Sequence, residues 1–376
     1  MKLLHYLAFL LALLTVCGAW TVGDTYVRRE LWKSWKLAFK KNYFSGREEL
    51  HRKRAFYSNL DFIIRHNRRY EYGLETYAVG LNEFSDLTPQ EFAETYLCLR
   101  GSVVMKLRRS KPVTSLPFTG RLPETVNWHE KGAVTSIKNQ GQCGACWSFS
   151  ACGAIEGQIA IKTGVLRSLS NQQLMDCSWE YGNQGCNGGL MPLAFQYVKK
   201  FGVEAEVDYR YEERVGRIVY NFWRFRHLHK HAIHIAYSPR RRLSNEMANY
   251  ASFDGVCRYR PDLIVANITG YVELPEGDEV GLQRAVATKG PVSVGIDASE
   301  PGFQSYSHGV YVSKTCTAAG IDHGVLAIGY GTEDGQDYWL VKNSWGRSWG
   351  EDGYIKMGRN LNNMCGIASM ASYPTV

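Results

Sequence analysis

Proline is scarce in this chain, at 11 of 376 residues, and charged residues make up only 21%. Together with 45% hydrophobic residues, this composition excludes a collagen-like or intrinsically disordered chain and allows a large packed core. Ten cysteines are too few for a small disulfide-rich fold. Beyond the N-terminus no stretch reaches about 18 consecutive apolar residues, so we expect no membrane span.

The N-terminus has the pattern of a secretory signal peptide. After Lys2 the chain is mostly apolar from Leu3 to Val16, and small residues follow in Cys17-Gly18-Ala19. We therefore predict a signal peptide over residues 1–19 and an oxidising compartment, in which disulfides persist. The sequon Asn267-Ile268-Thr269 predicts a glycosylation site at Asn267, which is consistent with that route.

The net charge of +8 is unevenly distributed. Residues 1–121 carry 20 Lys and Arg against 11 Asp and Glu, and residues 215–250 carry 7 against 1. The remainder carries 17 against 24, so the body of the protein is acidic and its N-terminal third is basic. This split argues against a nucleic-acid-binding face and favours two parts that attract each other.

Residues 26–96 have helical periodicity. Trp32, Trp35 and Phe39 form an apolar face. Spacings of three and four place a longer series along one stripe of a single helix: Glu48, Arg52, Phe56, Asn59, Ile63 and Asn67. Its polar members need partners, either one another or a facing element. We further predict a strand at 77–81, a helix capped by Thr88-Pro89-Gln90-Glu91, and an extended basic linker at 100–121.

From Leu122 onward glycine becomes frequent, and β-rich segments appear at 292–296, 324–329 and 338–341. A segment at about 215–250 has no clean period and is rich in Arg, His and aromatic residues. Three interpretations are open: a surface loop, translated intron sequence, or a functional arm whose histidines bind a metal. Those histidines would be His227, His229, His231 and His234.

The strongest chemical signal is NQGQCGACWSF at residues 139–149. A Gly-rich turn leads into a helix that we predict to begin near Cys146 and to run to about Lys162. A cysteine at a helix N-terminus is favoured as the thiolate, which is the nucleophilic form. Backbone N–H groups there and the amide of Gln140 are suited to hold an oxyanion. The alternative, a zinc or redox pair of Cys143 and Cys146, lacks a second C-x-x-C or a βαβ pattern.

A thiolate needs a cationic partner, and His323 is a candidate because it begins an apolar strand. Asn343 lies in a turn after another strand and is a candidate to orient the imidazole, with Trp345 and Trp349 shielding that hydrogen bond from water. From these residues alone, a purely structural role for His323 is the better-supported interpretation.

The run Cys143-Gly144-Ala145-Cys146-Trp147 resembles the active-site signature of the papain-like cysteine proteases. The chain is similar to their cathepsin L branch over nearly its whole length. The six-residue stripe and GLNEFSD at 80–86 resemble two motifs of that branch's inhibitory propeptide, and GCNGGLM at 185–191 resembles its substrate-binding wall. The resemblance implies an α+β fold of two lobes, a helical left lobe and a β-barrel-like right lobe with a cleft between them, preceded by a helical prodomain.

By this resemblance the chain divides into a signal peptide at 1–19, an inhibitory propeptide at 20–121 and a peptidase domain at 122–376. In the family only about ten residues separate the counterparts of Tyr211 and Cys257, so the segment at 215–250 is an atypical insert. Three disulfides are implied: Cys143–Cys186, Cys177–Cys257 and Cys316–Cys365. Cys152 is expected to be a small buried hydrophobic residue.

The resemblance also implies individual roles. Cys146 is the expected nucleophile, His323 the acid and base, Asn343 the orienting group and Gln140 the oxyanion donor. Expected substrate-binding residues are Gly188, Gly189, Leu190, Met191, Gly295, Ile321, Asp322, Trp345 and Met370. We expect an apolar pocket for the substrate residue two before the scissile bond, which Met370 shortens.

The expected protein is a cysteine endopeptidase made as a lysosomal or secreted zymogen and activated by propeptide removal at acidic pH. Acid would weaken the attraction between basic propeptide and acidic body, because carboxylates become protonated. Expected partners are protein and peptide substrates, the propeptide itself and cystatin-type inhibitors; we expect no nucleic acid, cofactor or metal, and a monomer. A non-catalytic binding protein of this fold would lack a catalytic group, and a free-standing inhibitor would end near residue 121.

Overall fold

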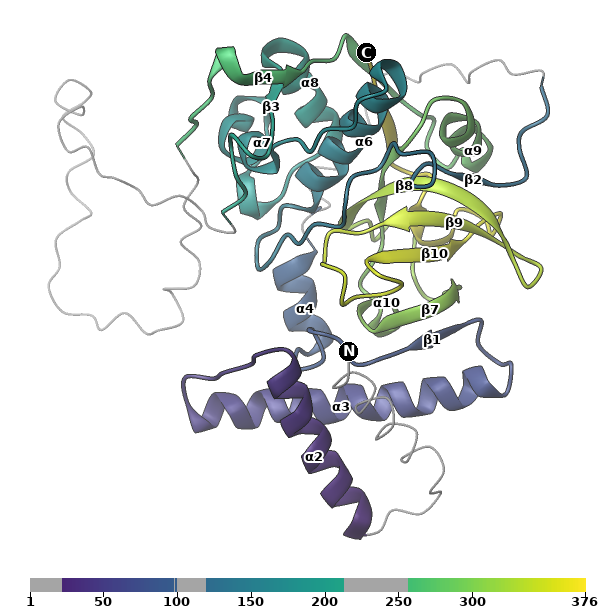
Figure 1. Ribbon diagram of the computed structural model, residues 1–376. Coiled ribbons are helices and arrows are strands. Elements are labelled where there is room, and N and C mark those ends of the chain that lie inside the picture. The colour runs from purple at the N-terminus through teal and green to yellow at the C-terminus, as the bar shows by residue number, and fades with distance from the viewer. Residues whose placement is uncertain (1–21, 98, 100–119, 213–255) are drawn as a thin grey trace, which may run out of the picture.

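The computed structural model describes residues 22–97, 99, 120–212 and 256–376. The predicted signal peptide, nearly all of the linker at 100–121 and the insert at 215–250 lie outside the described residues. Figure 1 shows the N-terminal helices below the rest of the molecule, at the purple end of the colour scale. None of the described helices is long and apolar enough to cross a membrane.

The N-terminal part consists of α2 (Val22–Ala38), α3 (Gly46–Glu71), β1 (Tyr77–Val79) and α4 (Pro89–Tyr96). The predicted single helix is confirmed: α3 contains the whole six-residue stripe, and the Ser45 side chain caps its N-terminus. Phe56 packs against Trp32 and Trp35 of α2, with ring centroids 5.2 and 5.0 Å apart. The two helices therefore meet through an aromatic core.

The polar stripe residues bond to a facing element, as expected. Asn67 exchanges two hydrogen bonds with the backbone of Val79, at 2.8 and 2.9 Å. Asn59 donates to the carbonyls of Ser85 and Leu87 at 2.9 and 2.8 Å. These buried amides fix β1 and the loop after it on α3, because an unpaired buried amide would be costly.

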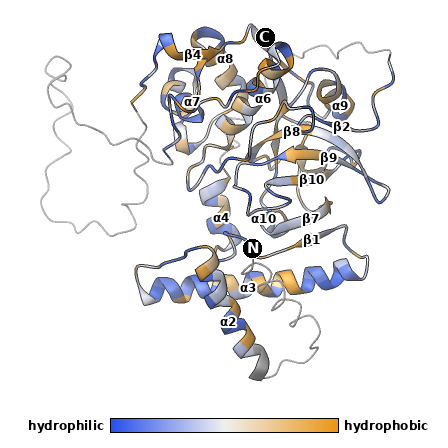
Figure 2. Ribbon diagram, viewed as in Figure 1, coloured by the Kyte–Doolittle hydropathy of each residue, from blue (hydrophilic) through white to orange (hydrophobic). Residues whose placement is uncertain are grey.

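The helical lobe is built around α6 (Cys146–Thr163), which begins at the predicted residue. Most of α6 is buried, which is typical of a central helix. It is joined by α7 (Asn171–Cys177), α8 (Met191–Phe201) and the short helices η1 (Trp179–Tyr181) and η2 (Gly185–Asn187). A small antiparallel pair, β3 (Val203–Glu204) and β4 (Ile264–Ala266), lies beside η4 (Pro261–Leu263). Figure 2 shows the hydrophobic colouring of α6 and α8.

The second lobe is a sheet. Its strands run in the order β1-β7-β10-β9-β8-β6-β11-β5, with β2 paired to β8, so the barrel-like lobe does not close into a barrel. The bounds are β2 (Val126–Asn127), β5 (Gly270–Glu273), β6 (Val292–Ile296), β7 (Tyr306–Tyr311), β8 (His323–Glu333), β9 (Gln336–Lys342), β10 (Tyr354–Gly358) and β11 (Ala371–Thr375). The three predicted strands are confirmed as β6 and parts of β8 and β9. Helices α9 (Glu279–Thr288), α10 (Pro301–Gln304) and η5 (Met364–Gly366) complete this lobe.

Strand β1 comes from the N-terminal part and pairs antiparallel with β7, so the N-terminal part adds a strand to the sheet of the second lobe. The Thr76 hydroxyl donates to the carbonyl of Val310, and the N–H of Gly80 donates to the carbonyl of Ser305. Backbone pairing therefore docks the N-terminal helices onto the sheet lobe.

Candidate active site

The start of α6 faces the start of β8 across the two lobes. Cys146 is the first residue of α6, and its sulfur accepts a hydrogen bond from the Gly324 N–H at 3.2 Å. Since Gly324 follows His323 in β8, this contact brings the predicted nucleophile and base together. Cys146 is disulfide-bonded in this structure.

His323 is held by two neighbours. Its Nε2 is 2.8 Å from Asn343 Oδ1, and its ring stacks on Trp345 with centroids 4.5 Å apart. The side chain is fully buried, and burial lowers its pKa to about 4, although the Asn343 bond favours the charged form. In this closed state the imidazole is therefore neutral in mildly acidic solution.

Gln140 lies beside the nucleophile, and its side-chain amide makes hydrogen bonds within the closed structure. Its Nε2 donates to the Cys143 carbonyl at 3.0 Å and to the Tyr96 carbonyl at 3.3 Å, and its Oε1 accepts from the Ser344 hydroxyl at 2.7 Å. Tyr96 ends α4, so a carbonyl of the N-terminal part occupies the expected oxyanion donor. Ser344, which the sequence analysis did not single out, sets the amide's orientation.

The wall formed by Gly188 and Gly189 is fixed to the nucleophile loop by the disulfide between Cys143 and Cys186. A Cβ on Gly189 would lie 2.5 Å from Asn183 Oδ1 and 2.7 Å from the Trp147 ring. Only glycine fits there, because the loop backbone lies directly against the indole.

The expected apolar pocket contains a leucine from the N-terminal part. A Cβ built on Gly295 would meet Ile321 at 2.8 Å, Met370 at 3.3 Å and Leu99 at 3.4 Å. Leu99 is 2% exposed and belongs to the same cluster as Leu190 and Met191. Its N–H donates to the Asp322 carbonyl at 2.8 Å. Leu99 therefore lies against Gly295, beside the predicted pocket residues Ile321 and Met370.

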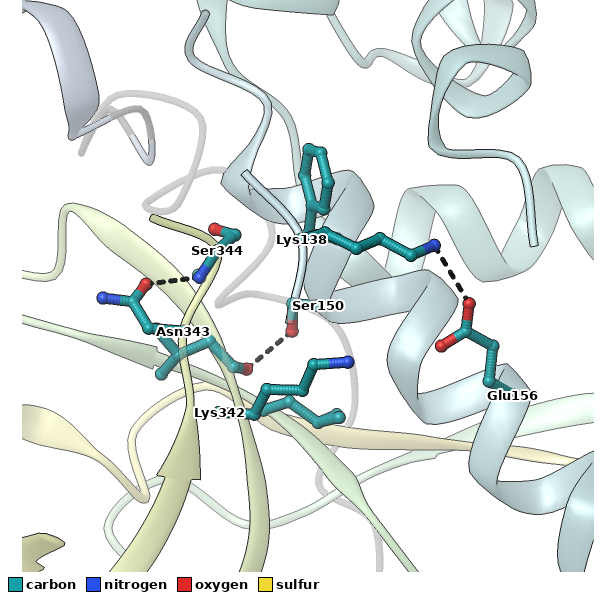
Figure 3. Close-up of a pocket in the computed structure, with 10 residues that line it drawn as sticks. Lys138, Ser150, Glu156, Lys342, Asn343 and Ser344 are labelled. Atoms are coloured by element: carbon teal, nitrogen blue, oxygen red, sulfur yellow. Dashed lines mark hydrogen bonds and ion pairs between the residues drawn. The ribbon is translucent and has the colours of Figure 1, made fainter. Parts of the chain in front are cut away.

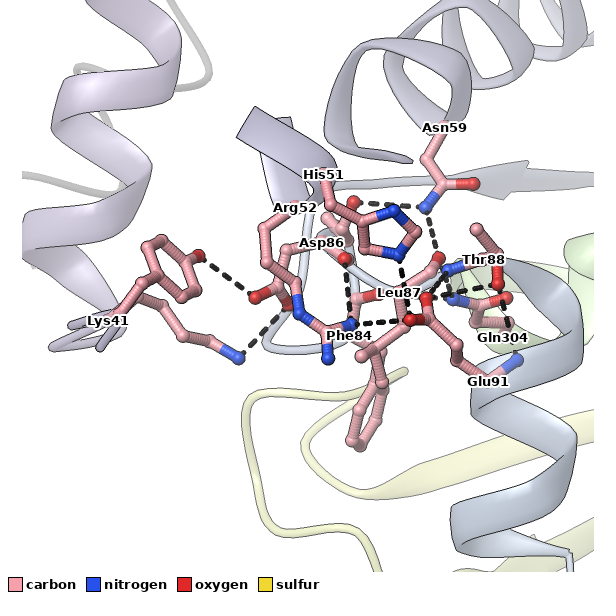
Figure 4. Close-up of polar contacts among 12 residues, drawn as sticks. Lys41, His51, Arg52, Asn59, Phe84, Asp86, Leu87, Thr88, Glu91 and Gln304 are labelled. Atoms are coloured by element: carbon pink, nitrogen blue, oxygen red, sulfur yellow. Dashed lines mark hydrogen bonds and ion pairs between the residues drawn. The ribbon is translucent and has the colours of Figure 1, made fainter. Parts of the chain in front are cut away.

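An aromatic cluster packs the N-terminal part against the site. Phe92 and Phe84 lie edge-on to Trp345, with centroids 5.1 and 5.6 Å away. Trp345 in turn stacks on His323. The loop between β1 and α4 is held from both sides, because Asn59 reaches it from α3 and Gln304 Nε2 donates to the Phe84 carbonyl at 3.1 Å (Figure 4).

A buried ionic cluster between the lobes was not foreseen from the sequence (Figure 3). Lys138 Nζ lies 3.2 Å from Glu156 Oε1, and Lys342 Nζ donates to the carbonyl of Thr135 at 2.8 Å. Burial lowers the pKa of Lys342 to about 8, although Glu156 favours its charged form. The cavity here, about 20 Å³, has room for one water molecule. The sequence contains only a weak indication of this ionic cluster. Lysines next to Asn139 and Asn343 resemble ordinary surface charges.

The remaining predicted residues fall as follows. The structure joins Cys177 to Cys257 and Cys316 to Cys365. Cys152 is a free, buried thiol, as expected, and burial raises its pKa. Asn267 is exposed in the loop between β4 and β5. Among the described residues, no group of three or more His, Cys, Asp or Glu side chains is arranged to hold a metal ion.

Comparison with known families agrees with this geometry. A model described as papain family cysteine protease matches residues 122–375, and one described as cathepsin propeptide inhibitor domain (I29) matches residues 32–92. The chain therefore belongs to the papain family of cysteine proteases, as a cysteine endopeptidase that carries its own propeptide inhibitor domain.

Its relatives include cathepsins of the L type. The chain is 44% identical to a cathepsin L-like peptidase of Aedes aegypti over 355 residues, which is 93% of each chain. It is 45% identical to cathepsin S of Mus musculus over 349 residues, which is 92% of this chain and 90% of the relative. The solved structure of digestive procathepsin L 3 from Tenebrio molitor larval midgut aligns with a TM-score of 0.77 at 38% identity, covering 93% of this chain and 99% of that one.

Proposed function

We propose that this endopeptidase cleaves peptide bonds through a Cys146 thiolate paired with a His323 imidazolium. The observation that carries the proposal is the hydrogen bond from the Gly324 N–H to the Cys146 sulfur, which sets the start of β8 against the positive end of α6. Asn343 accepts from the far nitrogen of the ring, which leaves the other nitrogen for proton transfer.

The proposed reaction is acyl transfer followed by hydrolysis. The thiolate attacks the scissile carbonyl carbon, and the oxyanion is held by Gln140 Nε2 and the Cys146 N–H. His323 gives its proton to the leaving amine as the C–N bond breaks, and then takes a proton from water as it attacks the thioester. Loss of the Gln140 donor should lower kcat by about 10²–10³-fold.

The closed form is proposed to be the latent zymogen. The Tyr96 carbonyl takes the Gln140 donor, and Leu99 fills the apolar pocket. Acid is proposed to favour opening, because an exposed His323 takes up a proton that the buried ring resists. Loss of the attraction between the basic propeptide and the acidic body stays a prediction, as a second contribution to opening in acid.

Specificity is proposed to be apolar at the residue two before the scissile bond. A leucine at this place in the closed form supports an aliphatic preference, and burying such a side chain contributes about 1.5–3 kcal/mol. Since Met370 narrows the pocket beside Gly295, leucine should be preferred over phenylalanine. A peptide panel measures this as kcat/KM, and a preference for arginine would refute the apolar pocket.

The targeting, domain division and maturation of the protein are proposed from the sequence pattern and the relatives. A signal peptide at 1–19 leads the chain into the secretory route, towards a lysosome or the extracellular space. The propeptide spans 20–121 and the peptidase domain 122–376. Glycosylation at Asn267, inhibition by cystatin-type proteins, a monomeric state and catalysis without a cofactor belong to the same proposal.

The test is labelling of the nucleophile after acid activation. The zymogen is incubated at acidic pH with a thiol reductant, because Cys146 is disulfide-bonded here, and then treated with a thiol-directed epoxide. We expect one label on Cys146, none in Cys146→Ala, and a new N-terminus near Leu122. Unchanged labelling of Cys146→Ala would show that another group is the nucleophile.

A further inference from the structure

A cavity of about 420 Å³ opens beside β3, in a part of the helical lobe that the proposed mechanism does not use. This volume lies in the range of ordinary small-molecule sites, about 300–1,000 Å³. Six charged residues line the cavity: Glu204, Asp208, Arg210, Glu212, Arg258 and Arg260. Because three are carboxylates and three are guanidiniums, their formal charges cancel, and the cavity presents groups of both signs.

One of these residues is a buried carboxylate with an unpartnered oxygen. Glu204 is 0% exposed, and its Oε1 accepts a hydrogen bond from the Arg260 N–H at 2.8 Å. Its Oε2 has no hydrogen-bond partner among the described residues. A buried carboxylate oxygen is costly unless a donor reaches it. This atom therefore indicates a donor that enters from the cavity.

The other lining charges are only partly paired. Arg258 forms an ion pair with Glu212 at 2.7 Å. The exposed side chains of Asp208, Arg210 and Arg260 make no ion pair or hydrogen bond with any described residue. Charges of both signs therefore line one cavity without neutralising one another, and they remain open to a ligand that also carries both.

One wall of the cavity is connected to the loop that carries Gln140. Tyr211 lies between the lining residues Arg210 and Glu212, and its hydroxyl donates to the Gln140 carbonyl at 2.6 Å. Its ring also lies edge-on to Phe149 of α6, with centroids 5.0 Å apart. A ligand that contacts this wall is therefore one side chain away from the loop beside the nucleophile.

We propose that this cavity binds a short peptide in its zwitterionic form, at a site separate from the catalytic cleft. The ammonium group of the peptide donates to Glu204 Oε2 and to the Asp208 carboxylate. The carboxylate of the peptide accepts from the guanidiniums of Arg210 and Arg260. A simple cation or anion would leave one of these pairs without a partner. Short peptides with free ends are products of an endopeptidase, and this source of the ligand rests on the proposed function.

The experiment measures binding of dialanine to the Cys146→Ala zymogen at neutral pH by isothermal titration calorimetry. N-acetyl-dialanine amide, which has neither terminal charge, is the matched probe. We expect dialanine to bind at least about tenfold more tightly, because each charged end makes a charge-assisted hydrogen bond that the capped end lacks. Glu204→Gln and Arg260→Gln should each weaken dialanine binding about tenfold. The controls Glu180→Gln and Lys289→Gln remove exposed charges elsewhere and should leave it unchanged.

Equal affinity for the two probes would overturn the inference, as would unchanged dialanine binding in Glu204→Gln and Arg260→Gln. Absence of dialanine binding at millimolar concentrations would also overturn it and would mean that water alone satisfies Glu204. The Arg260 side chain is exposed, so Arg260→Gln keeps the test decisive if Glu204→Gln fails to fold. Binding is read without catalysis, so a failed labelling of Cys146 would count against the proposed function and leave this measurement interpretable.

Discussion

The molecule contains two interfaces that are built from different chemical groups. The seam between the lobes contains buried charges: Glu156 pairs with Lys138 and accepts from the Thr135 hydroxyl, to which Lys342 donates. The surface covered by the propeptide contains rings, backbone hydrogen bonds and Leu99, and residues 22–97 make no ion pair with the peptidase domain among the described residues. One interface must persist through activation, whereas the other must open.

This difference limits how acid can act. Carboxylate protonation would break ion pairs, but the described propeptide contacts contain none that reach the peptidase domain. The titrating group lies under the interface instead, since His323 is buried beneath Trp345 and its pKa is lowered to about 4. Opening at acidic pH can therefore follow from proton uptake by a catalytic residue, while the lobe seam is left intact.

The largest expected effect comes from breaking the lobe seam with Glu156→Gln. The variant removes the buried carboxylate that pairs with Lys138 and favours the charged form of Lys342, so that Lys138 keeps only its ion pair with Glu206. This loss should cost about 3–5 kcal/mol of unfolding free energy in the mature enzyme. The loss should shrink above pH 8, because Lys342 with its pKa of about 8 then becomes neutral. Urea denaturation at pH 6 and pH 9 measures both effects.

The exposed Glu180→Gln is the matched control for this variant and should leave stability within about 0.5 kcal/mol. A loss below about 1 kcal/mol in Glu156→Gln at pH 6 would mean that the seam does not depend on this carboxylate.

Phe92→Ala should weaken the interface between the propeptide and the peptidase domain. The ring is fully buried against Trp345, and its removal leaves a cavity that costs about 3–5 kcal/mol of packing energy. We expect zymogen activity to appear at neutral pH, while kcat/KM of the mature enzyme stays unchanged because Phe92 leaves with the propeptide. The exposed Phe44→Ala is the control. Full latency of Phe92→Ala would show that the aromatic cluster does not hold the propeptide.

The pH dependence of opening tests the role of His323. The open form takes up a proton below the ordinary histidine pKa of about 6.5, whereas the closed form resists it until about 4. Closure should therefore weaken as pH falls through this range, by about 2 kcal/mol at pH 5. Hydrogen exchange of α4 in Cys146→Ala measures the opening, and adding His323→Asn should flatten its pH dependence.

Protonation of Asp322 favours the closed form, whereas protonation of His323 favours the open form, so a variant of Asp322 provides a second test. Burial raises the pKa of its carboxyl to about 7, so the closed form keeps this proton longer and gains stability as pH falls. Asp322→Asn should therefore steepen the acid-induced opening. If opening in His323→Asn follows pH as steeply as in its parent, the titrating group lies elsewhere.

Local features of the fold could be predicted from the sequence, and long-range ones could not. The start of α6 follows from the Gly-rich turn before it, the single helix that carries residues 48–67 follows from spacings of three and four, and β6 follows from its β-rich composition. The seam of Lys138 and Lys342 could not be predicted, because burial of these two side chains depends on the packing of two distant segments. Sequence spacing also gave no sign that β1 would pair with β7.

The smallest expected effect concerns the helix that presents Tyr96 to Gln140. Thr88 and Glu91 form a capping box at the start of α4, in which the Thr88 hydroxyl accepts from the Glu91 N–H at 3.2 Å. Thr88→Ala removes that acceptor and should cost about 1 kcal/mol of helix stability, so the zymogen should activate about fivefold faster at mildly acidic pH. Thr88→Ser keeps the hydroxyl and should activate at the parent rate. Equal rates for the Ala and Ser variants would mean that α4 is held by its rings alone, and the contrast between the two interfaces would then rest entirely on aromatic packing.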